Sequence, residues 1–455
     1  MSVKRTILKG TLILTITGFA TRFMGFFYRI FLSHTFGEEG VGLYQLIFPV
    51  YALCFSLTCA GIETALARCV AKRASVGKKK EARTLLFTGM ALSVSLSVIV
   101  MLLLQNYAEL IAAQFLKEKR CGSFLVILSY AFPFASIHSC IVGYYLGLKE
   151  TKIPAVSQLI EQLVRILSVY LLYLMGIKNG TKFSISIAVG GLIIGEIASS
   201  MFCLKMITKI TLQCQSLTKR IIRLPEYLTY AGELFILSAP LTASRVLLNL
   251  LQSIEAVSIP LKLQMHGMSV SQSLSTYGVL TGMALPCVLF PSAITNSVST
   301  MLLPTVAEAQ TLNRARQMKS IIQKSVCCCV LLGSLCCILL LLSGQWIGTF
   351  IFKSYSAGDY IVTLAWMCPF LYANTTLISI INGIGKTTLS FFINSLSLLI
   401  RIISVFYCIP LFGIEGYLLG LLASQLAAFL LCILYLSHYL HFQNKPLISL
   451  TKASG

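Results

Sequence analysis

The chain has 455 residues, of which 56% are hydrophobic and only 11% are charged. A soluble domain carries about 25% charged residues, so this composition excludes an ordinary soluble enzyme or binding module. The formal net charge of +21 would suit a nucleic-acid partner. The placement of the basic residues, however, follows membrane topology, and no nucleic-acid partner is expected.

Apolar runs of about 18 residues or more are long enough to cross a bilayer as helices. The sequence predicts twelve such helices, near 7–33, 41–67, 84–104, 121–147, 154–176, 183–204, 232–261, 274–303, 321–343, 357–382, 388–410 and 414–440. The fold class is therefore all-α, a polytopic membrane protein with twelve transmembrane helices.

The basic residues between these helices gather on one side of the membrane. With the N-terminus in the cytoplasm, the cytoplasmic segments hold 24 of the 36 Lys and Arg residues, whereas the outer loops hold seven. Cytoplasmic loops of membrane proteins carry such an excess. We expect a multi-pass protein of the cell membrane with both termini in the cytoplasm and basic loops that contact anionic membrane lipids.

The first predicted helix carries two arginines, Arg22 and Arg29, in an apolar setting. An arginine at the centre of a membrane helix costs about 2.5–3.5 kcal/mol by insertion scales. Small or polar residues at helical steps of three and four share one face, namely Thr11, Thr15, Gly18, Arg22, Gly25 and Arg29. In lipid, such a stripe must face protein or a water-filled cavity.

Single titratable residues occur inside three further predicted helices. Glu63 and Glu196 are candidates for binding a coupling ion or a proton. His138 is interpreted as a satisfied interior histidine. The cysteines lie in apolar runs without the spacing of a metal site, so no metal is expected.

Residues 133–170 and 369–406 repeat one another at an ungapped shift of 236, with nine of 38 positions identical. The repeat predicts a six-helix lobe over 1–204, a basic linker over 205–231 and a second six-helix lobe over 232–455. Because six is even, we expect the lobes to be related by a pseudo-two-fold axis along the membrane normal, with a cavity between them.

The repeat also pairs Arg165 with Arg401. Glu161 lies one helical turn before Arg165 and is placed to neutralise it. A structural role is expected for both of these arginines.

The seventh predicted helix carries a polar stripe that matches the first helix at a shift of 223, with Arg245 on Arg22. Arginine binds phosphate in a bidentate manner and stays protonated. We expect a substrate cavity for a pyrophosphate head, lined by Arg22, Arg29, Arg245, Asn249, Gln252 and Glu255. Hydrogen bonding between helices is the alternative interpretation of the stripes.

The segment "TRFMGFFYRIFLSHTFGEEGVGLYQLIFPVYAL", followed by "AGIETALARCVAKR", resembles the stage V sporulation protein B group of polysaccharide transporters. This group lies in the multidrug/oligosaccharidyl-lipid/polysaccharide flippase superfamily. The resemblance implies a lipid-linked saccharide flippase tied to spore cortex peptidoglycan. Related lipid II flippases carry essential arginines in the first helix, and "RFMGF" places Arg22 on that motif.

These features predict an alternating-access flippase that moves a polyprenyl-pyrophosphate-linked saccharide, such as a peptidoglycan precursor, to the outer leaflet. No nucleotide-binding loop pattern occurs in the sequence, and no catalytic residue, cofactor or enzymatic activity is expected. One alternative is a multidrug antiporter for organic cations, which would need acidic residues where the arginines stand. Another is a scaffold that recruits cell-wall synthases.

Overall fold

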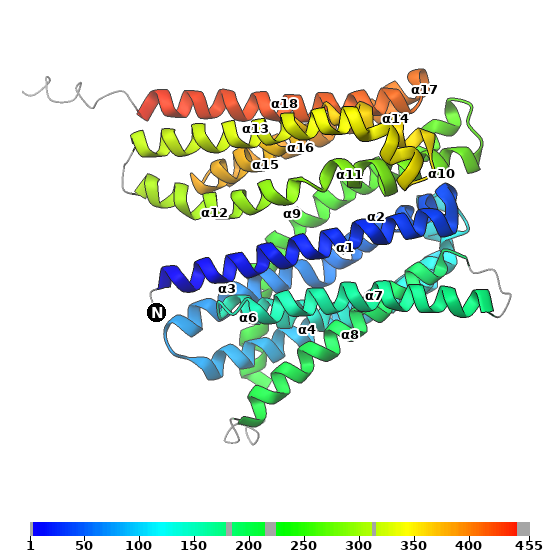
Figure 1. Cartoon of the computed structure of the whole chain (residues 1–455). Helices are drawn as coiled ribbons and strands as arrows, with labels where there is room; N and C mark the ends of the chain where they lie inside the picture. The colour runs from blue at the N-terminus through cyan, green and yellow to red at the C-terminus, as the bar shows by residue number, and fades with distance from the viewer. Residues whose placement is uncertain (1–2, 179–183, 214–223, 312–314, 444–455) are drawn as a thin grey trace, which may run out of the picture. The chain divides into compact units, whose positions relative to one another are not determined.

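The structure, a computed structural model, describes residues 3–178, 184–213, 224–311 and 315–443 and is built of helices throughout these ranges (Figure 1). The prediction of an all-α membrane protein is confirmed. Contacts divide the chain into two compact units, Met1–Gln264 with Met268–Gly282, and Met265–Gly267 with Met283–Gly455.

The first unit contains ten α-helices. They are α1 (Val3–Leu46), α2 (Phe48–Phe55), α3 (Gly61–Ser75), α4 (Lys79–Leu110), α5 (Cys121–Ser129), α6 (Ala131–Gly147), α7 (Lys152–Lys178), α8 (Ser186–Gln213), α9 (Leu224–Met265) and α10 (Val270–Gly278). The π-helical turns η1 (Ser56–Ala60), η2 (Ile111–Phe115) and η4 (Val279–Ala284) continue α2, α4 and α10.

The second unit contains the remaining helices. They are α11 (Leu285–Leu289), α12 (Ser292–Thr311), α13 (Ala315–Trp346), α14 (Tyr355–Ala365), α15 (Cys368–Gly383), α16 (Thr387–Ile403), α17 (Ile409–Phe412) and α18 (Ile414–Gln443), with the π-helical turns η5 (Ile347–Ile351) and η6 (Ser404–Cys408).

This division differs from the lobes suggested by the internal repeat. Helices α9 and α10 belong to the first unit by their contacts, whereas the repeat assigns them to the second lobe. The lobe boundaries 1–204 and 232–455 therefore stay a prediction. Residues 214–223 of the expected linker lie outside the described residues.

Eight helical segments in the described residues are long and apolar enough to cross a membrane, or up to eleven if each of three bent pairs is one span. The segment Leu12–Ser75 alone has 64 residues. Since the hydrocarbon core is only about 30 Å thick and a helix rises about 1.5 Å per residue, this segment is too long for one crossing. It breaks at Gly37, where φ is 70°. The count of twelve stays a prediction.

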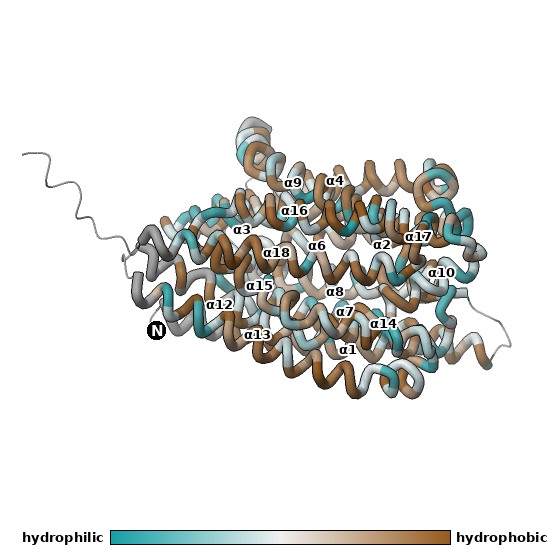
Figure 2. Tube along the Cα trace, turned by 90° about the horizontal axis from the view of Figure 1, so that it is seen from above, coloured by the Kyte–Doolittle hydropathy of each residue, from teal (hydrophilic) through white to brown (hydrophobic). Residues whose placement is uncertain are grey.

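The helices expose apolar side chains along much of their length. Hydrophobic residues dominate the middle of many helices, and hydrophilic residues gather toward helix ends and connections (Figure 2). On α13, Leu331, Leu335, Ile338 and Leu342 are all exposed, the last at 80%. Such surface would be an aggregation hazard in water, and it suits contact with lipid tails.

Two pairs of glycines, Gly143 with Gly147 on α6 and Gly191 with Gly195 on α8, lie where helices of the first unit pack closely. Small residues spaced four apart let membrane helices approach backbone to backbone. A Cβ atom added at Gly143 of α6 would lie 2.7 Å from the carbonyl oxygen of Glu63 on α3. A Cβ atom at Gly195 of α8 would lie 2.8 Å from the carbonyl oxygen of Glu161 on α7. This packing draws titratable side chains of four helices into one region.

Candidate functional site

A cavity of about 330 Å³ lies in the first unit, between α1 and α7. Three arginines line it, Arg22 and Arg29 from α1 and Arg165 from α7, together with the amides of Gln45, Gln158 and Gln162. Glu161 is the acidic residue in its lining. We call this space the arginine cavity. Its lining combines strong positive charge with neutral hydrogen-bonding groups.

Helical periodicity explains why α1 lines this cavity. Arg22, Gly25 and Arg29 recur at steps of three and four, and all three lie in the cavity wall. At Gly25 the two helices are in ordinary contact, since an added Cβ would lie 3.5 Å from Nε2 of Gln162 on α7. Arg29 donates a hydrogen bond from Nη1 to the carbonyl oxygen of Thr281 at 3.4 Å. Of the stripe found in the sequence, Arg22, Gly25 and Arg29 thus face this cavity.

A second cavity, of about 320 Å³, is lined by Glu63, His138, Glu161 and Glu196 with Tyr51 and Ser139. We call it the acidic cavity. Gln158 and Glu161 line both spaces, so the two cavities adjoin along α7. The arginine cavity and the acidic cavity therefore share the Glu161 carboxylate as part of their walls.

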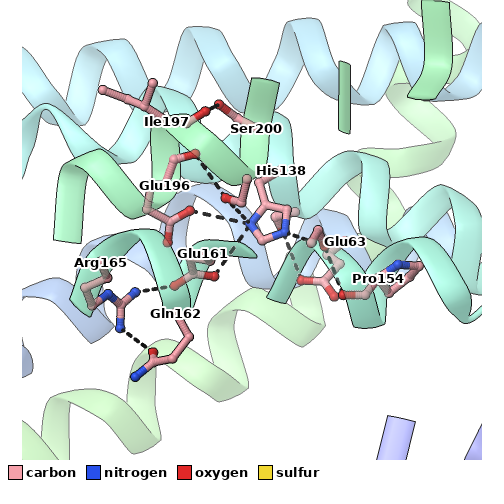
Figure 3. Close-up of polar contacts among 12 residues, drawn as sticks. Glu63, His138, Pro154, Glu161, Gln162, Arg165, Glu196, Ile197 and Ser200 are labelled. Atoms are coloured by element: carbon pink, nitrogen blue, oxygen red, sulfur yellow. Dashed lines mark hydrogen bonds and ion pairs between the residues drawn. The ribbon is translucent and has the colours of Figure 1, made fainter. Parts of the chain in front are cut away.

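Within the acidic cavity, three titratable side chains from three helices converge (Figure 3). Nδ1 of His138 on α6 lies 3.5 Å from Oε2 of Glu196 on α8 and 4.0 Å from Oε2 of Glu161 on α7. The other ring nitrogen, Nε2, lies 3.0 Å from Oγ of Ser157. Nδ1 also lies 3.3 Å from Oγ of Ser199, whose hydroxyl donates to the carbonyl oxygen of Glu196 at 3.0 Å. The Nδ1 edge therefore faces the two carboxylates.

The carboxylates of this cavity are held in different ways. Glu196 is only 5% exposed, and its Oε1 accepts a hydrogen bond from the Tyr51 hydroxyl at 3.3 Å. Its Oε2 is buried without a hydrogen-bond partner. Glu63 accepts a hydrogen bond from the Ser139 hydroxyl at 2.8 Å. The cluster therefore contains a buried carboxylate oxygen that has an ion-pair contact with His138 but no hydrogen bond.

Glu161 links the two cavities through Arg165. Its Oε1 forms an ion pair with Nη2 of Arg165, one helical turn later, which confirms the neutralisation predicted for this arginine. Nη1 of Arg165 also reaches Oε1 of Gln162 at 3.4 Å, and Nε of Arg165 is buried without a partner. The pair presents a carboxylate to the acidic cavity and a guanidinium to the arginine cavity.

The described residues contain one group of His, Cys, Asp or Glu side chains compact enough to share a metal ion. It consists of His138, Glu161 and Glu196, whose ligand atoms all lie within 4.8 Å of one another. Residue spacing does not reveal this group, because its members come from three helices. What the sequence does show is that α3, α6, α7 and α8 each carry a titratable residue at membrane depth. A titratable side chain inside a membrane costs free energy unless other polar or charged groups pair with it.

Residues 7–310 match the family described as polysaccharide biosynthesis protein, which is more than half of the chain. The chain belongs to this family.

Relatives and solved structures agree with this membership. The chain is 27% identical to stage V sporulation protein B of Bacillus subtilis over 94% of its own length and 83% of the relative. This confirms the group that the first two helices resemble. The fold is similar to that of a lipid II flippase MurJ in an inward closed conformation, at a TM-score of 0.71 and 15% identity, covering 94% of this chain and 87% of the other.

It is equally similar to an inward-facing multidrug resistance MATE family transporter of the MOP superfamily, at a TM-score of 0.71 and 13% identity. That match covers 94% of this chain and 96% of the other. The TM-scores establish a shared fold, and the low identities leave the cargo to be argued from this chain's own residues.

In this member of the polysaccharide biosynthesis family, the polar stripe of α9 contacts other helices of the first unit. Arg245 donates to the carbonyl of Ala60 at 2.9 Å and to Oγ1 of Thr64 at 3.1 Å. Asn249 donates to the carbonyl of Ala52 at 3.2 Å. Neither residue lines the arginine cavity or the acidic cavity. These contacts match the alternative interpretation, hydrogen bonding between helices.

The other residues of that stripe are placed differently. Gln252 is exposed and Glu255 is buried, and neither lines the two cavities. The structure thus brings Arg22 and Arg29 together with Arg165, and leaves Arg245, Asn249, Gln252 and Glu255 of α9 outside the lining of both cavities. A substrate-binding role for these four residues stays a prediction.

Proposed function

We propose that this protein is a flippase that moves a polyprenyl-pyrophosphate-linked saccharide, such as a peptidoglycan precursor, from the inner to the outer leaflet of the cell membrane. In this proposal the polyprenyl tail stays in lipid and the charged head crosses through the protein by alternating access. Both termini lie in the cytoplasm, as the distribution of basic residues indicates.

The arginine cavity is the observation that carries this proposal. Three guanidinium groups and one carboxylate line it, so its charge favours an anion. Guanidinium groups bind phosphate oxygens in pairs, and electrostatic attraction is stronger in a protein interior than in water. The glutamine amides of the lining offer donors and acceptors of the kind that sugar hydroxyls need.

The relatives are consistent with a cargo of this class. The chain shares a fold with a protein named lipid II flippase, and the family description refers to polysaccharide biosynthesis. A lipid-linked saccharide is an anionic amphiphile, which suits a basic cavity inside a helical membrane protein.

An antiporter of organic cations is the second candidate, because the acidic cavity favours it. Glu63, Glu161 and Glu196 line that space, and the chain shares a fold with a multidrug transporter. The two candidates make opposite predictions for the arginines, since removing positive charge would weaken binding of an anion and strengthen binding of a cation.

Headgroup translocation in proteoliposomes tests the proposal. The cargo is a fluorescent undecaprenyl-pyrophosphate disaccharide-pentapeptide, with a cationic dye as second cargo. We expect wild type to translocate the lipid, Arg22→Gln and Arg29→Gln to lose most of this activity, and Lys119→Gln in an exposed loop to behave as wild type. Dye transport without lipid translocation, unchanged by the arginine variants, would overturn the proposal in favour of the antiporter.

A further inference from the structure

Three potential ligand atoms meet in the acidic cavity. They are Nδ1 of His138, Oε2 of Glu161 and Oε2 of Glu196, each from a different helix. Nε2 of His138 lies 3.0 Å from Oγ of Ser157, while Nδ1 faces the two carboxylates and also lies 3.3 Å from Oγ of Ser199. Buried charges in proteins are paired or coordinate metals, and Oε2 of Glu196 is buried without a hydrogen bond, with Nδ1 of His138 3.5 Å away as its ion-pair contact.

We propose that His138, Glu161 and Glu196 bind a divalent transition-metal ion of the Zn²⁺ type, and that this ion competes with Arg165 for Glu161. The competition for Glu161 affects transport only through the proposed function, on which this part rests, because Arg165 lines the cavity assigned to the anionic cargo. The binding of the metal itself does not depend on the cargo.

The ligand set suits such an ion. One imidazole nitrogen with two carboxylates is a donor set of zinc and related first-row metals, and three protein ligands leave a further position for water. With metal–ligand bonds of about 2.0–2.1 Å, ligand atoms of a tetrahedral site lie about 3.3 Å apart. The Nδ1 distances of 3.5 and 4.0 Å to the two carboxylates are close to that spacing.

The surroundings supply what a metal site needs beyond its ligands. A ligating histidine donates its second ring N–H to an acceptor that fixes the ring, and Ser157 is in that position. Tyr51 orients Glu196 through Oε1 and leaves Oε2 free for the ion. The acidic cavity, which Glu63 also lines, gives a cation access to the cluster.

Metal binding would alter the ion pair between Glu161 and Arg165. With His138 neutral, Glu161, Glu196 and Arg165 together carry one negative charge, and a divalent ion turns this into one positive charge. The metal takes part of the Glu161 charge that now faces Arg165. Because Arg165 already has an unpartnered Nε, it then attracts an anion in the arginine cavity more strongly. The cation and the anionic cargo would thus favour each other's binding, and this coupling is reciprocal.

Calorimetric titration of Zn²⁺ into the full-length, chelator-treated protein in detergent tests the proposal. We expect one site that is lost in Glu196→Gln, a change that preserves side-chain size. Ser157→Ala is expected to weaken binding about 10-fold or more, as for other groups that orient metal ligands. Glu109→Gln and His34→Ala, at exposed positions outside the cavity, are the matched controls.

Arg165→Gln tests the competition. Removal of the guanidinium frees Glu161, so Zn²⁺ is expected to bind more tightly than in wild type. If Arg165→Gln does not fold, Arg165→Lys, which loses the planar fork and keeps the charge, replaces it and is expected to shift affinity in the same direction. Unchanged affinity in a folded variant would overturn the competition.

Co²⁺ distinguishes this cluster from the exposed thiols of Cys327 and Cys328. We expect a visible spectrum without thiolate charge-transfer bands. Equal Zn²⁺ binding by wild type and Glu196→Gln would overturn the site, as would binding through sulfur alone. If the protein binds the metal but does not translocate the lipid, the proposed function is wrong and the metal site is still supported.

Discussion

Glu161 and Arg165 form an ion pair one helical turn apart on α7, and Glu161 lies in the wall of both the arginine cavity and the acidic cavity. Both side chains are largely buried, at 17% and 18% exposure. The pair therefore contributes to the net charge of both cavities, because Glu161 lines both and Arg165 lines the arginine cavity. In the proposals made above, Glu161 binds a metal ion and Arg165 attracts an anionic cargo.

The first prediction concerns the stability of this pair. Removing one partner of a buried ion pair costs about 3–5 kcal/mol, because the other charge stays buried without compensation. Glu161→Gln should therefore lower thermal stability in detergent more than the double variant Glu161→Gln/Arg165→Gln does. Thermal unfolding of wild type, both single variants and the double variant measures this coupling. If the stability losses of the two single variants add up to the loss of the double variant, the pair contributes no coupling energy.

Local periodicity made part of this region predictable from sequence. Arg22 and Arg29 share one face of a helix because the steps between them follow the helical repeat, and they line one cavity. The pairing of Glu161 with Arg165 follows from their four-residue spacing. Both relationships lie within a single helix, where sequence distance determines distance in space.

Contacts between helices were not predictable in the same way. The interpretation of His138 as a satisfied interior histidine agrees with its contacts to Ser157, Ser199 and Glu196. The sequence did not indicate which helices would supply those partners. Arg245 was expected to line a substrate cavity with Arg22, and this stays a prediction; the structure shows its hydrogen bond to the carbonyl of Ala60, which the sequence did not predict. These outcomes depend on how α3, α6, α7, α8 and α9 pack. The glycine pairs were present in the sequence as a signal for close packing, but they do not say which helices approach.

The second prediction tests that glycine packing. A Cβ atom at Gly195 would lie 2.8 Å from the carbonyl oxygen of Glu161, whereas one at Gly190 on the same helix meets nothing within 4 Å. Gly195→Ala should force α8 away from α7 and lower the unfolding temperature. Gly190→Ala should be neutral or slightly stabilising, because alanine favours helix by about 1 kcal/mol. Equal behaviour of the two variants would contradict close packing at Gly195.

The third prediction concerns pH and the connection between α4 and α5. Hydrogen bonds from Arg120 lower the pKa of Glu118 below its ordinary value. A lowered folded-state pKa means that Glu118 stabilises the fold above the carboxyl pKa of the unfolded chain. This contribution is lost as the pH falls through the lowered folded-state value. Thermal stability should therefore decline on acidification below about pH 4.3, the ordinary glutamate pKa.

Glu118→Gln is the variant that isolates this effect. It should be less stable than wild type at neutral pH and should show a smaller decline on acidification. Arg120→Gln should flatten the same part of the curve, because it removes the donor to Glu118. Parallel curves for wild type and both variants would assign the acid sensitivity to other carboxylates.

The last prediction decides between the two interpretations of Arg245. Its donors are engaged by the carbonyl of Ala60 and the hydroxyl of Thr64, and each such hydrogen bond contributes about 0.5–1.5 kcal/mol. Arg245→Ala should therefore lower the unfolding temperature, while lipid translocation per folded molecule stays near that of wild type. Arg22→Ala should lose translocation per folded molecule, because Arg22 lines the arginine cavity. Translocation normalised to the folded fraction measures both. An Arg245→Ala protein with wild-type stability and no translocation would place Arg245 on the cargo path, as the matched stripes of the first and seventh helices predict.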